Sequence, residues 1–199
     1  MLDLSVFLIT SEEGHILINT GLADSTEHIR NNIESLGFRL EDVRILLTMQ
    51  AHWDHTAAMA EIKQLTGAEV WATPADARVL QDGGFSDAHF GGRESFDPVS
   101  VDRIIEQDDV ITLGDLSITV HEHPGHTEGS SSYSFQVSEN DRTYDVAIAN
   151  MGTINPGKHI VIDPTYEGVA VDFATTYNKQ KQMDVDVWVS AHASQYNMH

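Results

Sequence analysis

The hydrophobic pattern of this chain alternates between short apolar runs and segments with helical spacing. The runs 4–10 and 15–19 flank a Glu13-Gly14 turn, which predicts an antiparallel strand pair with both arms largely buried. Further strands are expected over 44–48, 70–72, 110–113, 116–120, 132–137, 146–149 and 185–190. Helices are expected over about 26–36, from Ala57 to Gly67, from Pro74 to Gly83, and over about 167–182.

The order of these elements predicts an α/β fold. A strand pair is followed by strand–helix units, then by a run of strands, a helix and a last strand, which suggests two mixed sheets packed together with helices outside. With 199 residues, 41% of them hydrophobic, the chain can bury one sizeable core, so we expect a single domain over 1–199. The segment from Gly83 to Pro98 has no clear period, and a loop of such length is expected beside the functional site.

The composition of the chain limits the kinds of molecule that it is expected to bind. The chain has 31 acidic and 11 basic residues, a formal net charge of -20, and this field repels nucleic acid and anionic membranes. High solubility and adaptation to high salt are both compatible with this charge. No apolar run approaches the ~20 residues of a membrane span, and the N-terminus has no signal-peptide pattern. Cysteine is absent, so any metal must be held by His, Asp, Glu or amide oxygen.

The most informative polar cluster follows the predicted strand 44–48. Gln50, His52, Asp54 and His55 bring two imidazoles, a carboxylate and an amide into the loop at the C-terminal end of that strand. A buried cluster of this kind is costly without a partner, and a bound cation is the natural one. The sequence therefore predicts a metal site at this end of the sheet.

Two more histidine-bearing loops follow predicted strands. Pro124-Gly125 forces a turn that re-aims His126, and His192 directly follows the last strand. Because ligand sites in α/β folds lie beyond strand ends, both residues are expected to join the histidines of the 50–55 loop around one metal centre. The other histidines are assigned surface or hydrogen-bonding roles: His15, His28, His89, His121, His123, His159 and His199.

Together these motifs resemble those of the metallo-β-lactamase superfamily. The resemblance rests on Gln50-Ala-His52-Trp-Asp54-His55, on Pro124-Gly125-His126-Thr127-x-Gly129 and on Ser190-Ala-His192, and it covers nearly the whole chain. It implies a four-layer αβ/βα sandwich with up to two zinc ions in the groove between the sheets. This fold agrees with the two sheets that the hydrophobic pattern predicts.

Within the superfamily, the absence of cysteine excludes the β-lactamase subclasses that use a thiolate ligand. The chain resembles the third subclass of class B β-lactamases, and Gln50, where that pattern has His, resembles its Gln-bearing (GOB-like) branch. The resemblance implies one or two zinc ions per chain. It implies that Gln50, His52 and His126 hold the first zinc. The second zinc would be held by Asp54, His55 and His192. An amide is a poorer zinc ligand than imidazole, so the first site is expected to be the weaker.

The resemblance implies a zinc-dependent hydrolase that opens the β-lactam ring. Zinc lowers the pKa of its bound water from ~15.7 to about 7, so a metal-bound hydroxide can attack the ring carbonyl while Asp54 orients it and passes the proton on. Thr153 or Asn155 is predicted to bind the substrate carboxylate, with the 83–98 loop as a flap. The expected partner is a small-molecule β-lactam, and not nucleic acid or membrane.

Two alternatives stay open. The first is another metallo-hydrolase of the same fold, acting on thioesters or lactones. The thioester, lactone and phosphodiester hydrolases of the superfamily resemble one another in an Asp that bridges both metals after the strand 146–149, where this chain has Asn150. The family also usually has further N-terminal strands and a C-terminal helix. This leaves an inactive truncated domain, or a short form that dimerises to cover its exposed faces, as the second alternative. The localisation that the resemblance implies is periplasmic or secreted.

Overall fold

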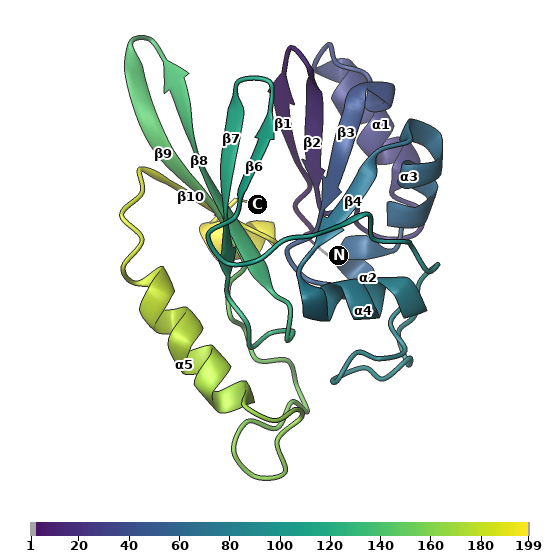
Figure 1. Ribbon diagram of the computed structural model, residues 1–199, viewed down its shortest axis with the longest axis vertical. Helices are drawn as coiled ribbons and strands as arrows, with labels where there is room; N and C mark the ends of the chain where they lie inside the picture. The colour runs from purple at the N-terminus through teal and green to yellow at the C-terminus, as the bar shows by residue number, and fades with distance from the viewer. Residues whose placement is uncertain (1–2, 199) are drawn as a thin grey trace.

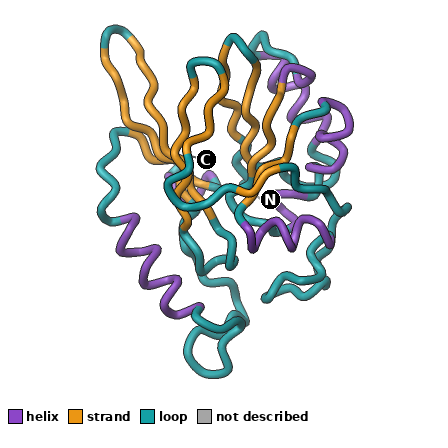
Figure 2. Tube along the Cα trace, in the orientation of Figure 1, coloured by secondary structure: helices purple, strands orange, loops and turns teal. Residues whose placement is uncertain are grey.

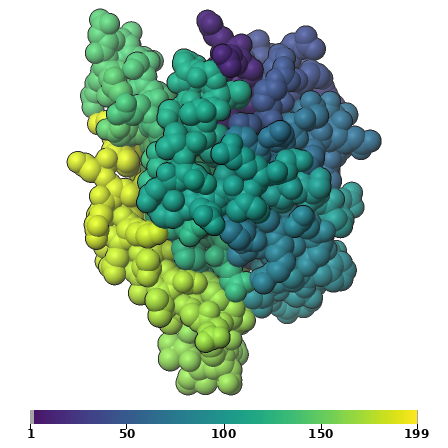
Figure 3. All heavy atoms as spheres, in the orientation of Figure 1, coloured from purple at the N-terminus to yellow at the C-terminus, as the bar shows by residue number. Residues whose placement is uncertain are grey.

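A computed structural model describes residues 3–198. The strands form two five-stranded sheets that face each other, and helices cover the outer side of the first sheet (Figure 1). Most of the long loops gather at the lower end of the sheets in this view (Figure 2). The N-terminal and C-terminal halves of the chain lie side by side (Figure 3), and each half supplies one sheet.

The first sheet has the strand order β1-β2-β3-β4-β5. β1 and β2 are antiparallel, with Phe7 opposite Ile18, and the other neighbours are parallel. Every residue of β2 is buried, because helices cover one face of this sheet and the second sheet covers the other. The bounds are β1 Phe7–Ser11, β2 Gly14–Ile18, β3 Val43–Leu47, β4 Glu69–Ala72 and β5 Arg103–Ile104.

Three helices pack on the outer face of the first sheet. Ile33 of α1 and Ile62 of α3 belong to one buried cluster with Leu46 of β3, as expected from their helical spacing. α3 and α4 are each followed by a glycine, Gly67 and Gly83, with φ of 71°, a conformation that glycine adopts without strain. The bounds are α1 Thr26–Ser35, α3 Met59–Thr66 and α4 Pro74–Asp82.

The second sheet has the strand order β10-β9-β8-β7-β6, antiparallel except for the parallel pair β9 and β10. Helix α5 packs against the ends of β7 and β9, where Lys179 Nζ donates to Glu122 O (3.1 Å) and Gln180 Nε2 donates to Asn150 O (2.7 Å). The bounds are β6 Val110–Leu113, β7 Leu116–Glu122, β8 Ser131–Glu139, β9 Arg142–Ala149, α5 Val169–Gln180 and β10 Val187–Ser190.

The two sheets are joined at the peptide carbonyls of Thr48 and Met49, directly after β3. Met49 O accepts hydrogen bonds from the Ser131 backbone N–H (2.9 Å) and from Asn150 Nδ2 (2.6 Å). Thr48 O accepts one from the Tyr133 hydroxyl (2.8 Å). These bonds lie beside an apolar core that both sheets share, so the start of the 50–55 loop is fixed to both halves of the molecule.

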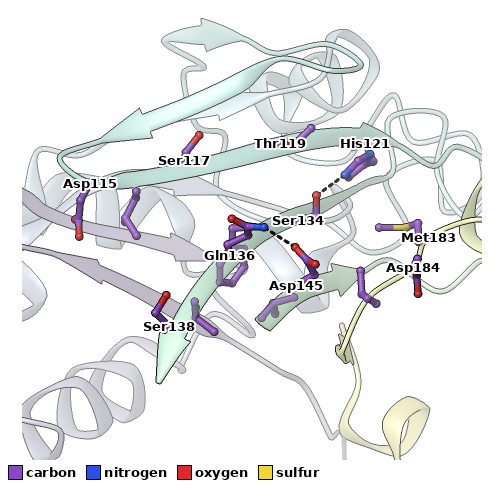
Figure 4. A pocket seen from close by; sticks show the side chains of 15 residues that line it. Asp115, Ser117, Thr119, His121, Ser134, Gln136, Ser138, Asp145, Met183 and Asp184 are labelled. Atoms are coloured by element: carbon purple, nitrogen blue, oxygen red, sulfur yellow. Dashed lines mark hydrogen bonds between the residues drawn. The ribbon is translucent and has the colours of Figure 1, made fainter. Parts of the chain in front are cut away.

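The outer face of the second sheet carries a polar groove of about 920 Å³ (Figure 4). His121 and Ser134 contact each other there (Nε2 to Oγ, 2.7 Å), and Gln136 Nε2 donates to Asp145 Oδ1 (2.9 Å). The strands alternate in character, because the side chains between these polar positions point into the shared core.

The fold class that the sequence predicts is confirmed: two mixed sheets are packed together with helices outside. The expected strands and helices all form, with ends shifted by a few residues. The sequence analysis missed β5, the short helix α2 (Trp53–Thr56), and the 3-10 turns η1 (Leu40–Asp42) and η2 (Ala193–Tyr196). These segments are too short to show a hydrophobic period.

Candidate metal centre

The 50–55 loop is anchored on both sides by backbone hydrogen bonds. The Thr20 N–H after β2 donates to His55 O (2.7 Å), and the His55 N–H donates to His52 O (2.9 Å). His52 is extended, and α2 begins at the next residue, so Asp54 and His55 lie on the first turn of a short helix. This change of backbone direction brings the histidine and aspartate side chains of the loop to one place.

Asp54, His55 and His192 form the metal-type group that the described residues contain. Their potential ligand atoms all lie within 4.8 Å of one another. Asp54 Oδ2 lies 3.4 Å from His55 Nε2 and 3.9 Å from His192 Nε2. The structure thus brings together the three residues predicted for the second zinc.

The residues predicted for the first zinc lie next to this group. The rings of His52 and His126 meet edge to face with centroids 4.9 Å apart, and Gln50 is buried beside them in the same cavity. Gly125 has a φ of 131°, and its N–H donates to Thr127 O (2.9 Å), which is the tight turn predicted for the Pro-Gly step. His126 Nδ1 donates to Thr153 O (2.7 Å), which leaves Nε2 free for a metal.

Both groups face one open cavity of about 320 Å³. Thr153 and Asn155, the predicted substrate-binding residues, lie on its wall. His55 is fully buried behind this wall, with its Nε2 3.4 Å from Asp54 Oδ2 and its ring edge to face with that of His192. Residues that line the cavity are Gln50, His52, Trp53, Asp54, His89, Phe90, His126, Thr153, Asn155, Pro156 and His192.

Burial keeps the imidazoles of His55 and His126 neutral, which is the form that binds metal. Burial, reinforced by the neighbouring histidines, holds the pKa of His55 well below its usual value and lowers the pKa of His126 to about 3. Burial also raises the pKa of Asp54. A nearby cation would oppose that effect and favour the carboxylate.

The residues present fit a zinc ion. Among residues 3–198, Nδ1 and Nε2 of His55 are buried nitrogens without a hydrogen-bond partner, an arrangement that costs free energy unless something binds there. Nitrogen and carboxylate ligands without thiolate suit zinc. The amide of Gln50 makes the first group the poorer donor set.

Two carboxylates that sequence reasoning missed stand behind the histidines. Asp3 Oδ1 lies 3.2 Å from His192 Nδ1, and Asp87 Oδ2 lies 3.4 Å from His52 Nε2. Asp87 belongs to the 83–98 loop, which its length had predicted to lie beside the site. Phe90 of that loop contacts the His52 ring. Nothing in the local sequence marks Asp3.

One of the other histidine assignments is wrong, because His15, expected on the surface, is buried against Phe38 (centroids 5.0 Å apart). His89 is partly exposed, lines the cavity and packs against Phe90 (4.6 Å). His121 and His123 do hydrogen-bond, to Ser134 and Ser132, while His28 and His159 are exposed. His199 lies outside the described residues.

The end of β9 carries an amide in place of a carboxylate. Asn150 is buried, its backbone N–H donates to Ser132 Oγ (2.8 Å), and its side chain donates to Met49 O. Asn150 Nδ2 is therefore engaged in joining the two sheets.

The profile of the metallo-beta-lactamase superfamily matches residues 3–139. The two facing sheets, with histidine-bearing loops at their strand ends, agree with this match, and the chain belongs to the metallo-beta-lactamase superfamily.

Within the superfamily, the chain is similar to solved class B3 metallo-beta-lactamases. LRA-12, a class B3 di-zinc metallo-beta-lactamase from an Alaskan soil metagenome, is 48% identical with a TM-score of 0.95, over 99% of this chain and 75% of that chain. GOB-18 from Elizabethkingia meningoseptica is 41% identical with a TM-score of 0.95, over 99% and 73%. A beta-lactamase from Chitinophaga pinensis is 45% identical with a TM-score of 0.96, over 99% and 75%.

The chain is also similar, at lower identity, to proteins named as hydroxyacylglutathione hydrolases. A hydroxyacylglutathione hydrolase from Bradyrhizobium sp. is 30% identical over 145 residues, 69% of this chain and 49% of that protein. One from Rhodospirillum rubrum is 30% identical over 105 residues, 53% of this chain and 33% of that protein. The chain thus spans a third to a half of these relatives. Within residues 3–198, no helix has the length and apolar character needed to cross a membrane.

Proposed function

We propose that this chain forms the catalytic core of a zinc-dependent β-lactam hydrolase of class B3, in the Gln-bearing branch. Three solved beta-lactamases align with nearly the whole chain at 41%, 45% and 48% identity, and GOB-18 is among them. The ligand sets predicted for two zinc ions face one cavity large enough for a small bicyclic substrate.

The observation that carries the choice of substrate class is Asn150. Thioester and phosphodiester hydrolases of the superfamily resemble one another in a bridging carboxylate at the end of this strand. Here the residue is an amide whose Nδ2 donates to Met49 O (2.6 Å), and an amide carries no negative charge to share between two cations. The centre therefore lacks the residue on which that two-metal chemistry depends.

Gln50, His52 and His126 would hold the first zinc, and Asp54, His55 and His192 the second. Bound zinc supplies a Lewis acid and lowers the pKa of a coordinated water to about 7. Burial favours the neutral, metal-binding form of His55 and His126 even before a metal is bound, because it lowers the pKa of both side chains.

Asp54 has the position of a proton acceptor. Its Oδ2 faces His55 and His192, so Oδ1 is left to accept a proton from the attacking water and to pass it toward the ring nitrogen that leaves. Asn155 is the better partner for the substrate carboxylate, because Thr153 already contacts His126 Nδ1 through its carbonyl and hydroxyl oxygens. The rings of Trp53, Phe90 and His89 give the cavity an aromatic wall for the rest of the substrate.

The second candidate function is hydrolysis of a glutathione thioester. It is favoured by the match to hydroxyacylglutathione hydrolase from Bradyrhizobium sp.. The identity of 30% to that protein is lower than the identity to the class B3 structures, and the match covers less of the chain. We therefore place it behind β-lactam hydrolysis.

The test is hydrolysis of a chromogenic cephalosporin with and without a chelator, beside a glutathione thioester and a homoserine lactone. We expect zinc-dependent turnover of the cephalosporin that the chelator removes. Turnover of only the thioester or the lactone would reject the β-lactamase assignment. A chain that binds zinc and turns over none of the three is an inactive metal-binding domain.

A further inference from the structure

Asp87 is a buried carboxylate directly behind the first metal group. It lies in the loop between α4 and β5, its side chain is only 7% exposed, and its Oδ2 is 3.4 Å from His52 Nε2. That distance is long for a hydrogen bond, and Nε2 has no other polar partner among the described residues. The loop thus brings a negative charge to the rear nitrogen of a predicted zinc ligand.

The loop holds this carboxylate in a fixed orientation. The backbone N–H groups of His89 and Phe90 donate to Asp87 Oδ1 at 3.0 and 2.5 Å, and the Gly91 N–H donates to Asp87 O (2.9 Å). Oδ2 is therefore the oxygen turned toward His52. The two loop N–H donors and the facing imidazole favour the carboxylate form of this side chain.

The contact selects which nitrogen of His52 can bind a metal. With Nε2 facing a carboxylate, the neutral ring carries its proton on Nε2, and Nδ1 is left as the electron-pair donor. The ring cannot turn freely, because Phe90 lies on one side (centroids 4.8 Å apart) and His126 on another (4.9 Å). His52 is thus held in one tautomer and one orientation.

The two metal groups differ in the charge of their ligands. The second group contains the carboxylate of Asp54, whereas Gln50, His52 and His126 offer one amide and two imidazoles, none of which is an anionic ligand. A divalent cation in the first group would have no anionic ligand. Asp87, one imidazole away, supplies the negative charge that this ligand set lacks.

From this geometry we propose, on the basis of the metal centre described under Proposed function, that Asp87 is the positioning residue of the first zinc site and offsets the weak ligand Gln50. It acts through His52, by fixing the ring and making Nδ1 a stronger donor. Carboxylate partners of zinc-bound histidines typically change metal affinity by about 10- to 100-fold. A merely structural alternative is that Asp87 only shapes the loop through its bonds to His89 and Phe90.

The test is stepwise zinc affinity, measured by competition with a chromogenic chelator, in wild type, Asp87→Asn and Asp97→Asn. Asp87→Asn keeps an oxygen acceptor for the loop N–H groups and removes only the charge. Asp97 is an exposed carboxylate of the same loop, so its variant controls for net charge. The unfolding midpoint of each metal-free protein is measured in parallel, and cobalt(II) absorption reports the geometry of each site.

We expect Asp87→Asn to weaken the first zinc site by about 10- to 100-fold and to leave the second site, the metal-free midpoint and Asp97→Asn unchanged. Wild-type affinity at the first site in Asp87→Asn would overturn the proposal. Equal loss at both sites together with a lower metal-free midpoint would assign Asp87 a structural role and overturn it too. Because zinc is measured directly, a chain that binds zinc but leaves cephalosporins intact refutes the proposed substrate and not the role of Asp87.

Discussion

Nδ1 of His192 lies 3.2 Å from Oδ1 of Asp3, so the second metal group is supported by residues from opposite ends of the described chain. Hydrogen bonds from Ser194 hold the pKa of Asp3 below its usual range, and the Ser194 N–H donates to Oδ2 at 2.7 Å. Asp3 is thus an ionised carboxylate that orients His192 with Nε2 toward Asp54. The first and second groups share this design, with Asp87 in the corresponding place at the first.

Asp3→Asn is expected to weaken zinc binding at the second site by about 10-fold or more, because His192 loses its carboxylate partner. Glu12→Gln, which removes one exposed charge on the β1–β2 turn, is the control for net charge. Stepwise zinc titration of both variants checks this. Identical zinc affinities in the two proteins would contradict the orienting role of Asp3.

Gln50→His is expected to raise the zinc content of the purified protein toward two per chain. Position 50 is buried on the cavity wall beside His52 and His126, and an imidazole there is a better zinc ligand than an amide. Elemental analysis after dialysis against a fixed zinc concentration measures the change. An unchanged metal count would refute the ligand set assigned to the first site.

Asp76 makes the stability of the metal-free protein depend on pH. Burial raises the pKa of this carboxyl from 3.8 to about 7, although Thr127 Oγ1 donates to its Oδ1 (3.1 Å). The folded state therefore keeps its proton to higher pH than the unfolded state does. The stability from this group is fully present below pH 3.8 and is lost as pH rises through about 7.

Asp76→Asn should remove this dependence, since the amide stays neutral. Urea unfolding at pH values from 4 to 8 is expected to show the variant gaining on wild type by up to roughly 1.4 kcal/mol per pH unit until pH passes 7. The measurement uses metal-free protein, so that zinc affinity does not contribute. A constant difference across the pH range would mean that Asp76 titrates normally.

Gly129 is the last residue of the Pro-Gly-His-Thr-x-Gly motif, and there is no room for a side chain at this position. A Cβ atom there would overlap the backbone nitrogen and the carboxylate of Asp76, which cannot move because α4 begins at that point. Gly129→Ala is expected to cost about 3 kcal/mol of unfolding free energy. Gly152→Ala is the matched control, since its Cβ would lie 3.1 Å from the edge of the exposed Tyr177 ring and not against backbone. An equal cost in both variants would refute the explanation.

The sequence predicted the fold because its strands are unusually easy to recognise. β2 and β3 are almost continuous apolar runs, since both faces of the first sheet are covered, and Gly67 and Gly83 end their helices where expected. The elements it missed, such as the two exposed residues of β5, are fixed by neighbouring strands rather than by their own pattern.

The residues of the candidate site also divide into those that the sequence predicted and those that only the structure shows. The predicted ligands meet because each follows a strand end, and strand ends converge in this kind of fold. Asp3 and Asp87 escaped prediction because an isolated aspartate has no period, and its partner lies far away in sequence. Only the tertiary structure shows that His89, a partly exposed residue, lies on the wall of this cavity.

The hydrogen bonds at the Thr48 and Met49 carbonyls place the predicted metal site at the junction of the two sheets, so metal binding should affect how firmly the sheets are held together. The 50–55 loop comes from one sheet, and His126 and His192 come from the other, so a bound ion would add a further link between two halves that are already joined by these hydrogen bonds and by a shared apolar core. Any relative sliding of the halves must stretch the coordination sphere. Starving the protein of metal should consequently loosen this interface well before either half loses its own strands.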